Sequence, residues 1–576
     1  MYGLTSRLST VEKVAAKPWV FGILLAAACL HQALQLHCYG PYGHKRFWHD
    51  LAMQMCAAQS CVDGHGLTYP VHSSKSIETQ RKKLSQWPLG YSVLFAALLA
   101  PHGDPWLATC VLDSTSIVLF FGSWFVIMRM LQPYVRPVAA LLVWFYWAFI
   151  WNPLALLQGA NLFTVAIFSC GMALCLASVH GLRPGLTALG CGICVALAAA
   201  CRYAYWPLVI VPPVSLLFCW FATDRRRSLL GAALLSGTVA AGLLVLLAGF
   251  NKWYVGDIAQ YTGSSNTGGL QWQQLTRMDY FPARMIGFSR IWQWFSERTT
   301  LDRILPAHAA SWKVSALVMI VAAIPLVSGW RSRRGYARGD AALARLLTFA
   351  CAGVLTLGLT VAMLGFLSVT VAPLRFASGQ LWTYLEQPRY YAPVLGFLSV
   401  ALASGIVKVF EIFRAKPWIY AVLAALMLAW FVLGIGFRAK TWIKEVANYE
   451  NVRTARQLEN RASREIHAAV REQLEQGRTA LFLSFSPRRP YPPFIPKTPY
   501  SVRIAGGCTL NPDFLQSPLE GGDPPRALFV LIPADAKSGP AESVSTMVES
   551  HEPFRPVARL QEGQVYMTLI KQAAQQ

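Results

Sequence analysis

Residues 37–91, HCYGPYGHKRFWHDLAMQMCAAQSCVDGHGLTYPVHSSKSIETQRKKLSQWPLGY, separate two long apolar segments of the chain. They hold the pair His49-Asp50, the turn from Asp63 to Gly66 and the basic run from Arg81 to Lys83. No other part of the first 250 residues gathers so many ionisable side chains outside an apolar segment. Because a loop of this length without a domain of its own is uncommon and usually functional, we expect much of the chemistry of the protein here.

The composition on either side of this loop is that of a membrane protein. Of 576 residues, 55% are hydrophobic and only 14% are charged, whereas a soluble domain carries roughly 25% charged residues. Apolar blocks recur along the chain. Each is long enough, or nearly long enough, to cross a bilayer core of about 30 Å. The sequence therefore predicts an α-helical polytopic membrane protein with about eleven transmembrane helices, at 18–36, 106–131, 137–157, 161–179, 186–201, 203–222, 229–250, 313–330, 346–372, 391–411 and 418–437.

The net charge of +23 does not indicate a nucleic-acid partner, because the basic residues lie at alternate turns between the apolar blocks. Such a pattern places the basic turns in the cytoplasm. We therefore expect a multi-pass protein of the inner (plasma) membrane with a cytoplasmic N-terminus and outward loops at 37–105, 251–312 and 373–390. The basic turns include Arg129/Arg136, Arg183, Arg225–Arg227, Arg331–Arg338 and Lys408–Lys416.

Residues 88–101, PLGYSVLFAALLAP, need a separate interpretation. Their apolar core of about twelve residues is shorter than the roughly 17 that a transmembrane helix requires. If they crossed the membrane, every later loop would change sides and the basic turns would face outward. We interpret this segment as a re-entrant or interfacial helix that closes the first loop.

The composition changes after residue 437, which predicts a transmembrane domain at 1–437 and a small extracytoplasmic α/β domain at 438–576. We expect a charged helix at 445–476, and short apolar strands alternate with helix in this region. The expected strands are 480–485, 527–533 and 564–570, with a further helix at 541–550.

Thirteen cysteines are present, and most lie inside apolar blocks, where cysteine acts as a small hydrophobic residue. Cys191 and Cys194 form a C-x-x-C pattern within an apolar block, for which membrane packing is the favoured interpretation. Cys38, Cys56 and Cys61 lie in the first outward loop, where an oxidising compartment permits one disulfide. The sequence does not determine which two of them pair.

The outward loops combine a carboxylate, basic residues and aromatic residues at the edge of the lipid. This combination suits a substrate that is half lipid and half polar, such as a lipid-phosphate-linked sugar, with a carboxylate as base for the acceptor hydroxyl. Arg389 lies just before a span, where helix N–H groups and the guanidinium fork both favour a phosphate. The candidate phosphate-binding residues are Arg389, Tyr390, Lys82, Lys83 and Arg202.

Alternative interpretations remain open for each candidate. Arg389 and Arg202 suit interfacial anchors, and Asp50 suits a helix cap or a surface salt bridge. Asp113 lies in the second span, where a carboxylate is costly. An interhelical hydrogen bond to the Ser and Thr residues around it is the favoured interpretation, and a functional role is the alternative. The candidate second carboxylates are Asp113, Asp63 and Asp257.

Over residues 18–437 the sequence resembles the GT-C glycosyltransferases, membrane enzymes that use polyprenyl-phosphate sugars. It is most similar to the bacterial branch related to protein O-mannosyltransferases and the aminoarabinose transferase of lipid A. The resemblance rests on the first-loop Asp50, the G-x-G-L-x-Y-P run at 64–70 and the Pro-Leu-Gly-Tyr run at 88–91. Arg202-Tyr203 and Arg389-Tyr390-Tyr391-x-Pro393, each before an apolar span, also match.

The resemblance implies an integral membrane glycosyltransferase that moves a hexosyl or pentosyl group from a polyprenyl phosphate to an extracytoplasmic lipid, glycan or protein. By position, Asp50 matches an aspartate implicated in acceptor activation or metal binding, and Arg389 matches a residue that faces the donor phosphate. His49-Asp50 stands where several relatives have Asp-Glu, and Trp87-Pro88 replaces a double proline. These departures leave open whether a divalent metal takes part, and which acceptor is used.

Two other classes of function are compatible with the sequence. A secondary transporter would show paired halves and polar residues at the bilayer midplane, neither of which is evident. A non-catalytic subunit of an envelope assembly would have the same topology with an inactive site. No nucleotide-binding glycine loop, zinc-ligand cluster or Gly-x-Ser-x-Gly motif is present.

The charge pattern makes a prediction about sidedness. A reporter that is active only in the cytoplasm, fused after Gln576, should be silent, because an odd number of spans places residues 438–576 outside. The same reporter fused after Arg227 should be active and serves as the control. Strong activity of the Gln576 fusion would mean that residues 88–101 cross the membrane.

Overall fold

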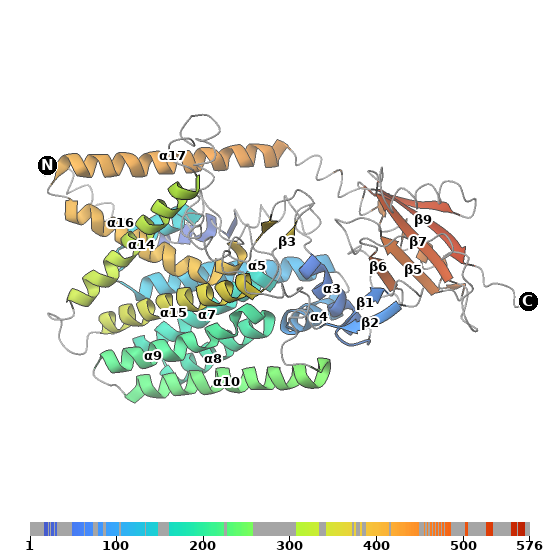
Figure 1. The fold of residues 1–576 in the computed structure, drawn as a ribbon, viewed down its shortest axis with the longest axis horizontal. Helices are drawn as coiled ribbons and strands as arrows, with labels where there is room; N and C mark the ends of the chain where they lie inside the picture. The colour runs from blue at the N-terminus through green and yellow to red at the C-terminus, as the bar shows by residue number, and fades with distance from the viewer. Residues whose placement is uncertain are drawn as a thin grey trace, which may run out of the picture. The chain divides into compact units, whose positions relative to one another are not determined.

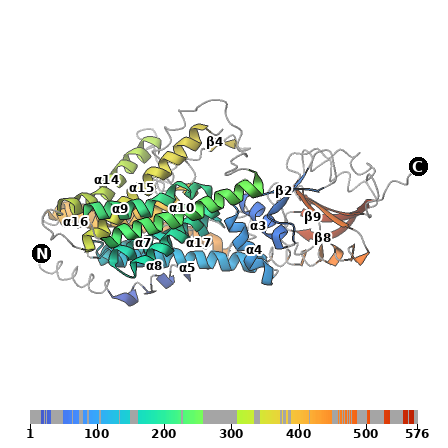
Figure 2. The same ribbon diagram turned by 90° about the horizontal axis from the view of Figure 1, so that it is seen from below.

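The computed structural model describes much of the chain, with short gaps inside several ranges. The described residues belong to 17–30, 49–147, 160–256, 307–332, 341–370, 374–375, 381–382, 388–447, 454–476 and the strands between 479 and 570. They form two compact units, the helical unit (Met1–Gln35 and Asp113–Ile443) and the loop–sheet unit (Leu36–Leu112 and Lys444–Gln576). Figures 1 and 2 show their elements.

The prediction of a polytopic α-helical membrane protein is confirmed. Among the described residues, eight helices are long and apolar enough to cross a membrane, and each coincides with a predicted block. Of the remaining three blocks, 18–36 and 313–330 contain shorter apolar stretches, Pro18–Ala27 and Lys313–Pro325. The block at 137–157 begins with helix α6 (Pro137–Phe145), and residues 148–157 lie outside the described part.

The helical unit consists of long helices joined by short turns. Its elements are α5 (Pro105–Met130), α6, α7 (Ala160–His180), α8 (Pro184–Cys201), η3 (Tyr203–Tyr205), η4 (Pro207–Ile210), α9 (Val211–Ala222), α10 (Arg227–Val255), α14 (Ala307–Ser332), α15 (Ala341–Thr370), β3 (Leu374–Arg375), β4 (Leu381–Trp382), η7 (Pro388–Tyr391), α16 (Ala392–Ile412) and α17 (Pro417–Ala447). Helices α7, α8, α9 and α10 pack side by side (Figure 1). Helix α10 extends to Val255, so the second outward loop begins later than the predicted residue 251.

A cluster of aromatic side chains forms the centre of the helical unit. The rings belong to α5, α6 and the turn after it, α15 and α16, and they meet edge to face or tilted, with centroids 5.2–6.5 Å apart. Such arrangements stabilise beyond the burial of area alone. The cluster comprises Phe120, Phe121, Trp124, Trp144, Trp147, Phe349 and Phe397.

Two indole N–H groups of this cluster donate to serine hydroxyls. Trp124 Nε1 donates to Ser169 Oγ of α7 at 3.1 Å, and Trp147 Nε1 donates to Ser399 Oγ of α16 at 3.2 Å. Because an unpaired polar group in an apolar interior is costly, these bonds fix the orientation of both indoles. The tryptophans therefore join α7 and α16 to the aromatic cluster.

Three glycines allow neighbouring helices to approach closely. A Cβ at Gly396 of α16 would overlap the Trp124 ring, and one at Gly405 would overlap the Val321 carbonyl group of α14. A Cβ at Gly192 of α8 would lie 2.7 Å from the Ser236 carbonyl oxygen of α10. Small residues at helix contacts permit the close packing that holds membrane helices together.

In the loop–sheet unit, the first loop folds into two helices and a hairpin, namely α3 (His49–Val62), β1 (Thr68–His72), β2 (Thr79–Lys83) and α4 (Gly90–His102). Helix α3 ends in a Schellman motif: Gly64 has φ +83°, its N–H donates to Cys61 O, and His65 N–H donates to Ser60 O. Strands β1 and β2 are antiparallel, with Tyr69 opposite Lys82. The G-x-G-L-x-Y-P run thus forms a helix cap and leads into a strand.

The C-terminal part of the same unit is a five-stranded sheet of order β6-β5-β7-β9-β8. Strands β6 and β5 and strands β5 and β7 pair in parallel, whereas β7–β9 and β9–β8 are antiparallel. Figure 1 labels β5, β6, β7 and β9. The predicted strands at 480–485, 527–533 and 564–570 are confirmed, whereas β6 and β8 were not predicted. The strands are β5 (Thr479–Ser484), β6 (Ser501–Ile504), β7 (Arg526–Pro533), β8 (Arg555–Leu560) and β9 (Gly563–Ile570).

Helical residues between 454 and 475 cover one face of this sheet. Ala462, Ile466 and Val470, four residues apart, are at most 2% exposed and share a core with Phe529 and Val565. A spacing of four residues is that of a helix with one apolar face. These residues lie within the charged helix predicted at 445–476. The helix predicted at 541–550 lies outside the described residues.

The contacts group the first loop with the C-terminal residues, whereas the sequence assigned it to the transmembrane domain. Contacts of β1 with β6 join the loop to the C-terminal residues. Within the loop, the elements bury apolar side chains against one another, and Ala57, Ala58, Leu84 and Phe95 are fully buried. The loop is therefore a folded part of the protein with its own small core.

The contact between Gly396 and Trp124 makes a prediction about stability. Gly396→Ala should lower the thermal unfolding midpoint of the detergent-purified protein, because the methyl group must displace a buried indole. Overpacking of this kind costs about 1–3 kcal/mol, and occasionally more.

Gly358→Ala in α15 is the matched control. A Cβ there meets nothing within 4 Å, so alanine should be neutral or stabilise the helix by roughly 0.5–1 kcal/mol. Equal midpoints for the two variants would contradict the packing described for α16.

Candidate functional site

Two of the predicted phosphate-binding residues meet in the helical unit. The guanidinium carbon of Arg202 lies 5.1 Å from the centre of the Tyr390 ring, which is a cation–π contact. Arg202 follows α8, and Tyr390 precedes α16, so residues far apart in the sequence are brought together at two helix ends. Both side chains are partly exposed.

The chain places Arg202 by ending α8 there. Arg202 has extended backbone angles (φ −156°, ψ 124°), while its N–H still donates to the carbonyls of Ala198 and Ala199. A cation at a helix C-terminus is favoured by the helix dipole. The next segment continues as the 3₁₀ helices η3 and η4, with Pro207 at the start of η4.

Aromatic residues after Arg202 brace this turn. Trp206 Nε1 donates to the Ala199 carbonyl at 3.1 Å, and the Tyr203 and Trp206 rings meet edge to face at 5.4 Å. Tyr205 is 4% exposed and packs against Phe168 of α7. The role of Trp206 was not predicted, although the run Tyr203–Pro207 signals it by its density of aromatic residues.

Tyr390 is placed by the short helix η7, which leads directly into α16. Pro388 begins η7, in agreement with the preference of proline for helix starts. The next residue, Tyr391, is 2% exposed and packs with Val394 and Leu398 of α16 and with α14 and α15 side chains. Tyr391 therefore anchors the segment, and Tyr390 is held beside it against the same cluster.

The guanidinium carbon of Arg202 lies over the Tyr390 ring. The group carries five N–H donors in its own plane, and a ring over its carbon leaves such donors able to bind an anion. Among the described residues, no carboxylate forms a salt bridge with Arg202. The arrangement provides a cation beside an aromatic ring, and a guanidinium can bind a phosphate in a bidentate manner.

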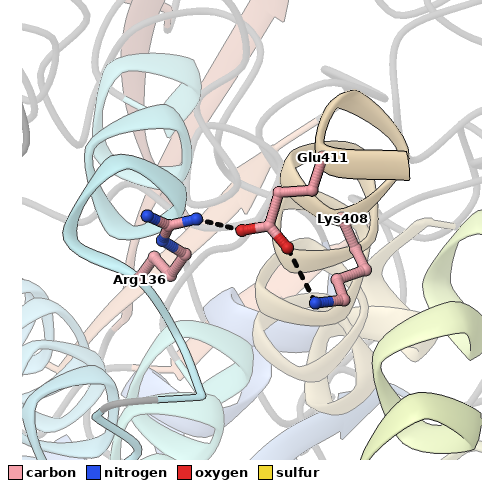
Figure 3. A network of polar contacts seen from close by, with 3 residues as sticks. All are labelled: Arg136, Lys408 and Glu411. Carbon is pink, nitrogen blue, oxygen red and sulfur yellow. Dashed lines mark hydrogen bonds and ion pairs between the residues drawn. The ribbon is translucent and has the colours of Figure 1, made fainter. Parts of the chain in front are cut away.

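At the opposite end of α16, Glu411 accepts from two cations (Figure 3). It pairs with Arg136, which precedes α6, and with Lys408 Nζ at 2.7 Å. The sequence assigned Arg136 and Lys408 only to the topology of the membrane protein. This network joins α16 to α6, so α16 is held at both ends.

The remaining phosphate and carboxylate candidates of the first loop belong to the loop–sheet unit. Asp50 is the second residue of α3, Lys82 and Lys83 end β2, and the Lys83 side chain is exposed. Their grouping with the residues of the helical unit therefore stays a prediction. The side chains of Asp50, Lys82 and Arg389 lie outside the description, although their backbones belong to α3, β2 and η7.

The other carboxylate candidates differ in what the structure shows of them. Asp113 is buried within α5 and has an interaction partner. Both a structural and a functional role are compatible with this position. Asp63 and Asp257 lie outside the described residues. In the described part of the chain, no group of three His, Cys, Asp or Glu side chains could hold a metal ion, and Cys61 is free. Cys38 and the Cys56 side chain are not described.

Comparison with known proteins gives structural similarities only. No known protein family and no curated protein sequence matches the chain. The chain is similar to the crystal structure of ArnT from Cupriavidus metallidurans bound to undecaprenyl phosphate, with 12% identity, 97% of this chain and 100% of that chain covered, and a TM-score of 0.48. The apo state of the same ArnT gives 12% identity, coverage of 91% and 94%, and a TM-score of 0.44.

A second similar structure is that of the Archaeoglobus fulgidus oligosaccharyltransferase in the apo form, with 12% identity and a TM-score of 0.41. The match covers 73% of this chain and 56% of that chain. At these identities and scores, neither protein determines a family or an activity for this chain.

Proposed function

We propose that this protein is a membrane glycosyltransferase that transfers a sugar from a polyprenyl-phosphate donor to an extracytoplasmic acceptor. The observation that carries the proposal is the cation–π contact of Arg202 with Tyr390, 5.1 Å from the guanidinium carbon to the ring centre. It joins the two Arg–Tyr segments that the sequence singled out as phosphate-binding. Aromatic residues and a cation at the ends of membrane helices suit a phosphate at the end of an apolar chain.

The proposed chemistry needs three functions. The edge of Arg202, together with Arg389, binds the donor phosphate and stabilises the negative charge that grows on it as the bond to the sugar breaks. Asp50 removes the proton from the acceptor hydroxyl, whose oxygen attacks the anomeric carbon. The products are the glycosylated acceptor and the polyprenyl phosphate, and Lys82 and Lys83 are further candidates for phosphate contact.

Radiolabelled polyprenyl-phosphate sugar, incubated with the purified protein in vesicles, tests the proposal. Transfer of label to a lipid, glycan or protein acceptor from the membrane extract supports a glycosyltransferase. Movement of the intact donor into the vesicle lumen supports a transporter. The absence of both transfer and movement supports an assembly subunit. The last two results would contradict the proposal.

A prediction follows from the contact between Arg202 and Tyr390. Tyr390→Leu should weaken donor binding roughly 2- to 30-fold, which corresponds to about 0.5–2 kcal/mol for a cation–π contact. Tyr390→Phe keeps the ring and should bind donor nearly as the native protein does. Donor dissociation constants measured on purified protein give the comparison.

A double-mutant cycle identifies the partner of Tyr390. If the ring acts by orienting Arg202, Tyr390→Leu should have little further effect in an Arg202→Ala background. Arg202→Lys should be impaired as well, because an ammonium group lacks the planar fork. Additive effects of the two substitutions would show that Tyr390 acts independently of Arg202.

A further prediction concerns Asp50. Asp50→Asn preserves the shape of the side chain and removes its basicity, so turnover should fall on the order of a hundredfold or more while donor binding persists. Because Asp50 lies in the first turn of α3, the loss of its charge should also cost about 0.3–1 kcal/mol of stability. Kinetics and thermal unfolding of the same variant separate the two effects.

Chelator added to the native protein then distinguishes a base from a metal ligand. Loss of activity that a divalent cation restores would identify Asp50 as a metal ligand, and unchanged activity would identify it as the base. Near-native turnover of Asp50→Asn would instead show that the carboxylate is structural and would direct attention to Asp63, Asp113 and Asp257.

A further inference from the structure

Thr360 of α15 is a buried threonine whose hydroxyl group makes no hydrogen bond. The residue is 2% exposed, and its Oγ1 has no hydrogen-bond partner among the residues that the structure describes. Two other threonines of the same helix behave differently: Thr348 and Thr356 donate to the carbonyls of Ala344 and Ala352, one turn earlier, at 2.9 and 2.7 Å. A helical threonine commonly satisfies its hydroxyl in this way. Thr360 therefore leaves a polar group unpaired in an apolar interior, where such a group is costly.

The packing of α15 against α16 determines where this hydroxyl lies. The Cβ position of Gly353 is 3.3 Å from Cδ1 of Phe397. The two helices are antiparallel, because later residues of α15 share a core with the first residues of α16. Thr360 is seven residues after Gly353, and Tyr390 is seven residues before Phe397. Seven residues are about two helical turns, or roughly 10 Å, so Thr360 lies on the α16 side of α15 at the level of Tyr390.

The contacts of α15 connect Thr360 to the candidate site. Helix α15 contacts η7, which carries Tyr390, and also η4, which follows Arg202 by a few residues. Leu357 and Val361, the neighbours of Thr360 on α15, pack against the same core as Tyr390. The unpaired hydroxyl and the Arg202–Tyr390 contact therefore belong to the same end of the helical unit.

The chemistry of a hydroxyl at this place favours an anion as its partner. A threonine hydroxyl has one O–H to donate, and hydrogen bonds to an ionised acceptor are stronger than those to a neutral one. Arg202 supplies the positive charge for such an acceptor at the same end of the unit. An apolar ligand would leave the hydroxyl unpaired.

We infer that the Thr360 hydroxyl donates a hydrogen bond to the phosphate of the polyprenyl-phosphate donor, beside Arg202. The inference rests on the proposed function and adds to it a phosphate-binding residue from α15. In the structure without ligand, Oγ1 is enclosed. The side chains around it, including the partly exposed Tyr390, therefore shift when the phosphate binds.

Binding of a short prenyl phosphate tests the inference. The probes are farnesyl phosphate and farnesol, which has the same apolar chain without the phosphate, and affinities are measured by calorimetry on the detergent-purified full chain. Thr360→Val should bind farnesyl phosphate roughly 10-fold or more weakly than the native protein, because a hydrogen bond to a charged group is lost. Its affinity for farnesol should be unchanged.

The thermal unfolding midpoint separates ligand binding from a structural role. Without ligand, Thr360→Val should unfold at the native midpoint or above it, because valine removes a buried hydroxyl that has no partner. Thr360→Ser and Thr360→Ala form a second pair that differs only in the hydroxyl, and only the alanine variant should lose phosphate affinity. Thr356→Val is the matched control and should bind farnesyl phosphate as the native protein does.

Native affinity of Thr360→Val and Thr360→Ala for farnesyl phosphate would overturn the inference. Equal weakening for farnesyl phosphate and farnesol would also overturn it, because the defect would then concern the apolar chain. Arg202→Ala shows whether the proposed site itself is correct. If Arg202→Ala loses phosphate affinity and the Thr360 variants do not, only this inference fails; if the native protein binds both probes equally, the proposed phosphate site fails with it.

Discussion

The close approach of α16 to α5 is the contact on which the helical unit depends. Gly396 has no side chain, so the Trp124 ring lies directly against the α16 backbone, and the indole N–H is satisfied by Ser169 of α7. Within a bilayer, no hydrophobic force drives helices together, and packing and interhelical hydrogen bonds must do so. A single glycine thus lets one indole connect three helices.

The position of α16 matters because both of its ends carry polar groups. At one end, Tyr391 is buried beside α14 and α15, and Tyr390 supports Arg202. At the other, Glu411 pairs with Arg136 and Lys408. Half-exposed ion pairs stabilise little by themselves, about 0–1 kcal/mol. Their main effect here is to set the register of a helix whose other end places the candidate site.

Much of the fold follows from one-dimensional patterns, and the site does not. The bilayer fixes the length of a span, so apolar runs such as 161–179 and 203–222 could be located within a few residues. Strands β6 and β8 could not, because Ser501–Ile504 is short and Arg555–Leu560 mixes charged with apolar residues. The Arg–Tyr pairs could be recognised as candidates, but no pattern in the sequence shows that Arg202 would meet Tyr390.

The meeting of Arg202 with an aromatic ring also explains how the chain keeps a cation at a helix end among apolar neighbours. A guanidinium is weakly hydrated and has a planar face, so an aromatic ring can replace the water on that face, which it could not do as well for an ammonium group. The Ala199 carbonyl oxygen at the end of α8 accepts from the Arg202 backbone N–H and from Trp206 Nε1. These bonds hold the backbone of the turn, and the ring contact holds the guanidinium beside Tyr390. A cation is thus kept at the helix end by contacts that use no acidic side chain among the residues that the structure describes.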